Sequence, residues 1–214
     1  MTQFDFAAAI RNRPSGQTTS ALVAAFGNPE GPGAGSSPQG GAWFTPSPTW
    51  VRANVIKIPL SELPGFPRCP YGALSGVSLH RLVAPVFRAT WAELHRRGLT
   101  KHLRTFDGSV AYRHMGHDRS RPLSAHAFGI ALDFDAAWNG YGVPLEQMQI
   151  NREVVQVFEE CGWTWGGAGQ EPTRMGCTSS GRTRWPGCGC RSGKTRRRAR
   201  WPPLRPLHQA LLDG

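Results

Sequence analysis

The longest helical periodicity of the chain lies near its middle. Apolar side chains recur there, beside Trp91, at intervals of three and four residues: Leu79, Leu82, Val83, Val86, Phe87 and Leu94. This spacing predicts an amphipathic helix over residues 79–97. Pro85 then lies in the first turn of the helix or kinks it, and Gly98 ends the helix.

Two shorter segments also have helical patterns. Residues 4–12 predict a short helix that ends before Pro14. Residues 152–161 predict a longer one, in which Asn151 can cap the first turn and Gly162 can end the last. The inward positions of this second helix are Val154, Val155, Phe158 and Cys161.

Strands are predicted where apolar residues alternate or run together. Residues 54–60 and 130–134 have such patterns, and residues 102–106 and 110–113 flank a turn at Asp107-Gly108. Strands and helices are mixed without a regular βαβ alternation. We therefore expect an α+β fold, with a small mixed or antiparallel sheet and flanking helices.

Two regions show neither periodicity. Residues 27–48 are rich in Gly, Pro and Ser, which is typical of a flexible linker or a loop. From Gly166 onward there are ten of the 25 Lys and Arg residues but only two of the 14 Asp and Glu residues, so the net charge of +11 is concentrated there. We expect an N-terminal extension over 1–50, a domain over 51–167 that is incomplete at its C-terminal end, and a basic, disordered tail over 168–214.

Composition narrows the class of protein further. The chain of 214 residues is long enough for one domain with a core plus extensions, and we expect a monomer. No apolar run is long enough to cross a bilayer, so membrane insertion is not expected. The N-terminus has an acidic residue at Asp5 and no basic region, which makes it a poor secretory signal. An odd number of cysteines, five, argues against a closed disulfide framework.

The most informative chemistry lies in Ser124-Ala-His126-Ala-Phe-Gly129-Ile-Ala131-Leu-Asp133. Zinc accepts neutral imidazole and carboxylate ligands, so a His at a turn and an Asp on the following strand can converge on one ion. Gly129 permits the turn, and Ala131 leaves room on the strand face that it shares with Asp133. The alternative is that His126 and Asp133 form a hydrogen-bonded structural pair.

Together these positions resemble the Ser-x-His-x-x-Gly-x-Ala-x-Asp motif of the zinc peptidases that cut bacterial cell-wall peptides. That family comprises the D-alanyl-D-alanine carboxypeptidases and dipeptidases, and the L-alanyl-D-glutamate endopeptidases found among phage endolysins. The resemblance implies the zinc D,D-peptidase (hedgehog-like) fold, with Zn²⁺ held by His126 and Asp133. It also implies that Ser124 binds substrate or orients the motif, although Ser124 could instead only cap the turn.

The resemblance also implies a substrate and a setting. Peptidoglycan stem peptides are the expected substrate, and both carboxypeptidase and endopeptidase activity fit. A phage or prophage lysis enzyme is one setting, because no signal peptide is visible. We therefore expect synthesis in the cytoplasm and action on the bacterial cell wall.

The residues before the motif extend the resemblance. In the family, an Arg on a strand shortly before the motif contacts substrate and helps to stabilise the transition state, and Arg113 matches that position. An Arg there can hold a peptide carboxylate bidentately or stabilise an oxyanion, although it could also be a surface or structural residue. His114 and His117 are interpreted as loop histidines, since the family pattern does not use them. Asp135 is a poorer ligand candidate than Asp133, and we expect it to end the strand or to face solvent.

The resemblance covers residues 51–167 and then stops. Trp163-Thr-Trp165-Gly-Gly167 resembles the segment that leads into the last motif of the family, Asp/Glu-x-x-His. The His of that motif is the third zinc ligand and its carboxylate is the general base. No such motif follows Asp133, and the next histidine is His208. Two protein ligands would hold zinc weakly, and the base would be missing.

A shift of reading frame offers an explanation for the missing motif. We considered the codons for residues 174–181, Arg-Met-Gly-Cys-Thr-Ser-Ser-Gly, read from each third base. This frame forces Gly at the Met175–Gly176 junction and His or Tyr at the Cys177–Thr178 junction. It is compatible with Asp-Gly-Met-His-Phe-Glu-Trp, which is the missing motif at the expected place. The hypothesis also explains the abrupt change to an Arg-, Cys-, Pro- and Gly-rich composition.

Other interpretations of the tail remain open. Its Arg-rich run over 196–200, with Trp201, could bind nucleic acid or an anionic cell-wall polymer. A metal cluster is a further possibility, although the spacing matches no tight zinc motif. The candidate ligands are Cys177, Cys188, Cys190 and His208.

The predicted function is a zinc metallopeptidase domain that acts on peptidoglycan stem peptides, with impaired activity in this chain. The alternatives are a non-catalytic cell-wall or metal-binding protein of the same fold, and a basic nucleic-acid-binding protein. Nucleic acid is not the partner that we expect.

Overall fold

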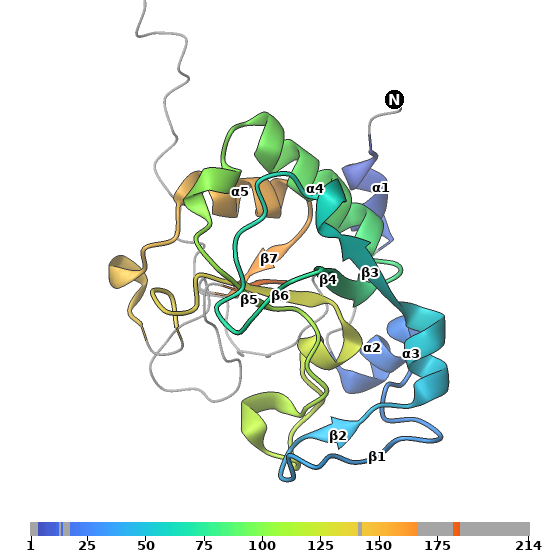
Figure 1. Ribbon diagram of the computed structural model, residues 1–214. Helices are drawn as coiled ribbons and strands as arrows, with labels where there is room; N and C mark the ends of the chain where they lie inside the picture. The colour runs from blue at the N-terminus through green and yellow to red at the C-terminus, as the bar shows by residue number, and fades with distance from the viewer. Residues whose placement is uncertain (1–3, 13, 15–17, 141–142, 167–181, 185–214) are drawn as a thin grey trace, which may run out of the picture.

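The computed structural model describes residues 4–12, 14, 18–140, 143–166 and 182–184 (Figure 1). Its helices are α1 (Phe6–Arg11), α2 (Thr19–Phe26), α3 (Pro48–Asn54), α4 (Ala84–Arg96) and α5 (Arg152–Glu160). Its strands are β1 (Gly35–Ser36), β2 (Phe44–Thr45), β3 (Val55–Pro59), β4 (Gly76–His80), β5 (Phe106–Gly108), β6 (Ala131–Phe134), β7 (Thr164–Trp165) and β8 (Arg182–Arg184). Short 3-10 turns connect them, among them η3 (Met115–His117) and η4 (Ala125–Phe128).

Within these residues the strands form small antiparallel sheets. β1 pairs with β2, and β3 pairs with β4 in a register that runs from Val55↔His80 to Pro59↔Gly76. The remaining strands form a sheet of order β5-β6-β8-β7. Helices α4 and α5 pack on one side of that sheet, whereas α2 and α3 lie near the β1–β2 hairpin, toward the bottom of the view (Figure 1). This mixture of helices and antiparallel sheets agrees with the predicted α+β class.

The core is centred on Phe134, the last residue of β6. Its ring lies 5.4 Å from that of Phe106 and 6.2 Å, stacked, from that of Trp91, measured between centroids. Phe66 and Phe158 complete the cluster at 6.0 Å each. Because side chains alternate along a strand, a buried Phe134 directs its neighbour Asp133 to the opposite face.

Helix α4 begins at Ala84, so the predicted start at residue 79 is wrong. Residues Gly76–His80 form β4, where Val77 and Leu79 are fully buried and alternate with a half-buried Ser78. Leu79 happens to stand at helical spacing from the apolar residues after it, which extended the apparent helix backward. Pro85 lies in the first turn of α4, one of the two positions expected for it.

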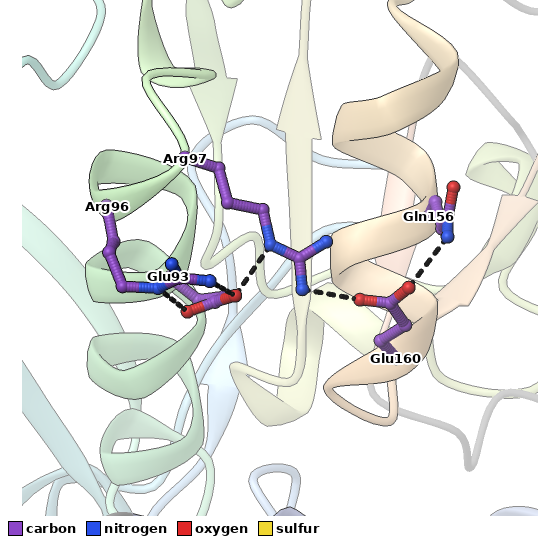
Figure 2. Close-up of polar contacts among 5 residues, drawn as sticks. All are labelled: Glu93, Arg96, Arg97, Gln156 and Glu160. Carbon is purple, nitrogen blue, oxygen red and sulfur yellow. Dashed lines mark hydrogen bonds and ion pairs between the residues drawn. The ribbon is translucent and has the colours of Figure 1, made fainter. Parts of the chain in front are cut away.

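A ladder of charged side chains joins α4 to α5 (Figure 2). Both Arg96 and Arg97 donate to the Glu93 carboxylate at 2.6 Å, and the hydrogen bond from Arg96 is the main cause that lowers the pKa of Glu93 to about 2. Arg97 also donates to Glu160 at 2.8 Å, and the Gln156 amide donates to Glu160 at 2.7 Å. Such exposed pairs contribute little to stability, so these contacts hold the two helices together only modestly.

Residues 27–48, for which a flexible linker or a loop was predicted, form a loop-rich segment that packs on the domain. The preceding α2 adds Leu22 and Phe26 to the hydrophobic core, and β2 adds Phe44. The Ser47 side chain donates to the Pro32 carbonyl at 2.7 Å, and the Ser47 amide donates to the Pro29 carbonyl at 2.8 Å. The glycines and prolines of this segment therefore serve tight turns between anchored apolar residues, which composition alone does not reveal.

Two of the predicted strands differ in the structure. Residues Thr100–His102 form a 3-10 turn, and β5 begins only at Phe106. The segment 110–113 is not a strand, because its hydrogen bonds are divided between two partners: the Ala111 amide donates to the His126 carbonyl at 3.1 Å, and the Tyr112 carbonyl accepts the Phe44 amide at 3.0 Å. Both predicted segments lie near the sheet, but β5 pairs with β6 and not with residues 110–113.

Strand β8 lies between β6 and β7, within the range 168–214 for which the sequence predicted a disordered tail. An antiparallel strand there pairs with the inner edges of both neighbours, which explains how a segment without apolar periodicity can join a sheet. The rest of that range lies outside the described residues. So do the predictions made for the Arg-rich run, the tail cysteines and His208.

None of the helices in the described residues is both long and apolar enough to cross a membrane. The longest of them, α4, has 13 residues.

Candidate metal centre

A tight turn positions His126. In η4 the Ser124 hydroxyl accepts the His126 amide at 3.4 Å, and Gly129 ends the turn in the left-handed region, at φ +67°. The Gly129 carbonyl accepts the His80 amide at 2.8 Å, and a Cβ on Gly129 would lie only 2.9 Å from that same nitrogen. The sequence therefore needs glycine here both for its backbone angle and for the close approach of β4.

The His126 ring is buried and held by one of its two nitrogens. Nδ1 lies 2.8 Å from the Ser109 carbonyl, which can only accept, so Nδ1 carries the proton. In the neutral ring Nε2 then presents its lone pair. Nε2 is buried and has no hydrogen-bond partner among the described residues. This is the arrangement in which a main-chain carbonyl orients a metal-ligating histidine.

Asp133 approaches the unprotonated nitrogen from β6. Its Oδ2 lies 3.4 Å from Nε2 of His126. Two ligands at about 2.0–2.2 Å from a tetrahedral zinc ion are separated by roughly 3.3 Å, so this spacing fits an ion between them. The contact is close enough for an ion pair but is not a hydrogen bond, since Nε2 has no hydrogen-bond partner among the described residues. The spacing is compatible with a metal site and equally with a structural His–Asp pair.

A third ligand is missing from the part of the chain that the structure describes. No group of three His, Cys, Asp or Glu side chains able to hold a metal ion occurs among those residues. Among the described residues the donor set therefore offers zinc two protein ligands, His126 and Asp133. The roles of His126 and Asp133 as ligands stay predictions.

Arg113 lies close enough to Asp133 for their charges to interact. Only 6% of its surface is exposed, and its guanidinium donates to the His114 carbonyl at 3.3 Å. Burial lowers the pKa of Arg113, and the negative charge of Asp133 acts in the opposite direction. Because a guanidinium holds its proton far more tightly than any other side chain, Arg113 stays protonated and brings a fixed positive charge to the site.

The other residues considered from the sequence have structural partners. Ser124 caps the turn of His126, which was the alternative to its substrate-binding role. His114 lies in a loop as predicted: its Nδ1 is 2.6 Å from the Arg121 carbonyl and its Nε2 is 3.4 Å from Glu30. His117, also in that loop, is exposed at a φ of 58°.

Asp135 ends β6 but does not face solvent. It is 1% exposed, and its Oδ1 accepts the amides of Arg104 and Thr105, both at 2.8 Å. Of the two alternatives expected for Asp135, the place at the end of the strand is the one found, and the solvent-facing side chain is not. These two amides need an acceptor where the chain enters β5, and Asp135 supplies it from the neighbouring strand end.

Two contributors to this site were missed from the sequence. Ser109 acts through its main-chain carbonyl, for which no residue type gives a signal. Trp43 lies across an antiparallel bridge from Arg113, and its ring centroid is 6.0 Å from the guanidinium carbon. A lone Trp next to Phe44 in a Gly-rich segment was the one available hint, because such a residue is out of place in a flexible linker.

Comparison with known proteins agrees with the motif. Residues 117–172 match the family of D-alanyl-D-alanine carboxypeptidases. The matched range contains Ser124, His126 and Asp133, and Arg113 lies just before it. The comparisons with curated proteins and with solved structures return no match. The family match supports a relationship to the zinc D,D-peptidase superfamily, and with it a peptidase-family domain that acts on cell-wall peptides.

Proposed function

We propose that this chain carries part of the zinc site of a metallopeptidase that hydrolyses peptide bonds in peptidoglycan stem peptides. The observation that carries the proposal is the pairing of a lone-pair nitrogen, Nε2 of His126, with Oδ2 of Asp133 at 3.4 Å. These two atoms would hold the ion. A zinc ion bound there would supply Lewis acidity toward a peptide carbonyl.

The protein's own residues contribute orientation and charge. Ser109 fixes the tautomer of His126 through its carbonyl. Arg113, buried and protonated, would hold a substrate carboxylate or stabilise the oxyanion that forms during attack on the carbonyl. Such a charge is strongest in a site from which water is largely excluded, and the burial of Arg113 meets that condition.

The missing third ligand is the reason to expect impaired activity. We propose that the shifted frame over 174–181, with His at the Cys177–Thr178 junction, represents the lost Asp-x-x-His motif. In support, β8 follows this segment closely and pairs with β6, with Arg182 opposite Asp133. A strand at this place brings its backbone next to the half-site, where a third ligand is needed. The base lost with the motif is worth about 10²- to 10⁴-fold in rate.

The first test is the DNA sequence of codons 160–185. It should contain CAC, not TAC, across the Cys177–Thr178 junction. A tyrosine codon there would remove the main support for the frameshift.

The second test compares the chain as written with a version whose frame is restored just after Gly167. Zinc affinity is measured by calorimetry, and cleavage of purified peptidoglycan is measured with and without a chelator. The restored chain should bind zinc at least 100-fold more tightly, because it regains a protein ligand, and should release peptides in a chelator-sensitive way. Release of terminal D-alanine would identify a carboxypeptidase, and internal cuts would identify an endopeptidase.

The control is His126→Ala in the restored chain, which should abolish both readouts. If the chain as written already cleaves stem peptides and His126→Ala stops it, another residue completes the site and the frameshift account is wrong. If neither version binds zinc, the metallopeptidase proposal fails.

A non-catalytic wall-binding protein of the same fold is the second candidate, because the described residues lack a third ligand. In that case the chain as written would co-sediment with purified peptidoglycan, zinc would not change the amount bound, and the restored chain would release no peptide.

A further inference from the structure

The segment that carries Trp43 is fixed to the segment that carries Arg113 by main-chain hydrogen bonds on both sides of the pair. The Phe44 amide donates to the Tyr112 carbonyl, and the His114 amide donates to the Ala42 carbonyl, both at 3.0 Å. These bonds flank the antiparallel bridge Trp43↔Arg113. Trp43 and Arg113 are thus a non-hydrogen-bonded pair, the kind in which opposed side chains lie closest together.

The same geometry settles the direction of the Trp43 ring. Residues opposite each other in such a pair project to the same face, and their neighbours project to the other. Ala42 and Phe44 are buried at 3% exposure, and Phe44 contacts the Tyr112 ring at 6.0 Å on that other face. Trp43 is only half-buried and shares its face with Arg113. Its ring is 6.0 Å from the guanidinium carbon, at the outer limit of a cation–π contact.

Besides Arg113, the Trp43 ring contacts the ring of His117 in the neighbouring loop, at 6.0 Å between centroids. Phe44 makes the contact of this segment with the hydrophobic core, and main-chain hydrogen bonds set its register against the segment of Arg113. A large aromatic ring left partly open beside a buried arginine, which in turn faces Asp133, is placed to contact whatever the arginine binds.

We propose that Trp43 is a substrate-binding residue, whose ring packs against the peptide residue whose carboxylate Arg113 holds. This inference rests on the proposed function and adds one residue to the same site. That residue belongs to the N-terminal segment, outside the range matched by the family. The ring would cover the apolar side of a small residue such as D-alanine and keep water from the ion pair between carboxylate and guanidinium.

The test is a titration of the chain with D-alanyl-D-alanine, followed by the tryptophan indole N–H signals in NMR. The Trp43 signal is identified by its loss in Trp43→Phe. It should shift on titration with the dipeptide and stay unchanged with D-alanyl-D-alanine amide, which lacks the carboxylate. Trp43→Ala should weaken dipeptide binding about fivefold or more, and Trp43→Phe, which keeps an aromatic face, about twofold or less.

Trp138 provides a matched control. Its ring lies 3.8 Å from the Arg104 guanidinium, so Trp138→Phe alters a similar cation–π pair that takes no part in the site. This variant should bind the dipeptide as the unmodified chain does. Thermal unfolding of Trp43→Ala checks that a loss of binding is not a loss of fold.

The outcomes separate the two proposals. Dipeptide binding that is carboxylate-dependent but unchanged in Trp43→Ala would overturn the role of Trp43 and leave the proposed function standing. A chain that binds neither the dipeptide nor purified peptidoglycan would overturn both. A Trp43 signal that shifts equally with the amide would show contact without the carboxylate pairing and would also overturn the inference.

Discussion

Two buried histidines of this protein, His80 and His126, differ in how their second nitrogen is used. In His80 both nitrogens meet the main chain: Nδ1 accepts the Leu82 amide at 3.2 Å, and Nε2 lies 3.1 Å from the Phe26 carbonyl, to which it donates. In His126 only Nδ1 has such a partner, at the Ser109 carbonyl. A histidine satisfied at both nitrogens ties segments together, whereas one satisfied at a single nitrogen keeps a lone pair for a ligand.

The surroundings of the two buried rings differ. Burial lowers the pKa of His80 to about 4, so that ring is neutral at physiological pH. Its acceptor, the Phe26 carbonyl, also receives the Trp50 indole N–H at 2.9 Å, which ties α2 and α3 to β4. His126 instead faces a carboxylate, and Arg113 stands nearby. Burial alone therefore does not distinguish a structural histidine from a candidate ligand; the set of partners does.

The largest expected effect is the loss of stability when Gly129 is substituted, because its main chain contacts that of His80. Gly129→Ala should lower the free energy of unfolding by about 3 kcal/mol, since it adds a left-handed strain of about 1–2 kcal/mol and a clash with the His80 backbone. Gly98→Ala is the control: Gly98 has the same φ of +67° as Gly129 but open space around its Cβ position, so only about 1 kcal/mol should be lost. Urea unfolding measures both, and equal losses would show that the close approach carries no cost.

The next effect concerns pH and should come from His80. An unfolded histidine titrates near 6.5, so acid favours protonation of the unfolded chain over the folded one. The stability that depends on neutral His80 is present above about pH 6.5 and is lost as the pH falls toward about 4, with roughly 2 kcal/mol gone by pH 5. Denaturant unfolding at pH 7 and pH 5 measures this loss. His80→Gln cannot titrate and should show a smaller difference between the two pH values; an identical difference would mean that other groups cause the acid sensitivity.

A smaller effect concerns the stability gained on zinc binding, which should depend on His126 but not on His80. At a zinc concentration about ten times the Kd, a ligand that binds only the folded chain adds about 1.4 kcal/mol of stability. We expect this gain in the unmodified chain and in His80→Gln, but not in His126→Ala or Asp133→Asn. All four proteins share the same tail, so zinc bound there by unfolded chains cancels in the comparison. A gain that survives in His126→Ala would place the zinc elsewhere.

The smallest effect belongs to Ser124. Its hydroxyl accepts the His126 amide at 3.4 Å, a long bond, so Ser124→Ala should cost about 0.5 kcal/mol in urea unfolding. If Ser124 only caps the turn, the alanine variant of the frame-restored enzyme should keep its KM. A rise in KM with unchanged stability would instead support a role in substrate binding.

Local sequence patterns predicted those elements whose signals are local. Asn151 caps α5 as expected, with its side chain accepting the amides of Glu153 and Val154. The strand that ends at Phe134 and the turn at Gly129 also follow from residue type and spacing. These features depend on interactions within a few residues, which a linear pattern records.

Features set by distant partners could not be predicted in the same way. Leu79 fits a helix by spacing and a strand by alternation, and only its pairing with Ile56 decides for β4. Trp43 belongs to the site because its segment pairs with residues about 70 positions later in the chain. The same applies to Asp135, whose burial follows from two amides at the entry to β5.

The hydrogen bond from the His80 amide to the Gly129 carbonyl offers a way to measure how often the turn of the motif opens. Exchange of that amide with deuterated water requires the bond to open, and opening moves the turn that holds His126 away from β4. Its exchange rate would therefore report how often the half-site loses its shape, in the absence of any ligand. A chain that kept the turn would still exchange this amide proton slowly, even if it bound no metal and cleaved no peptide.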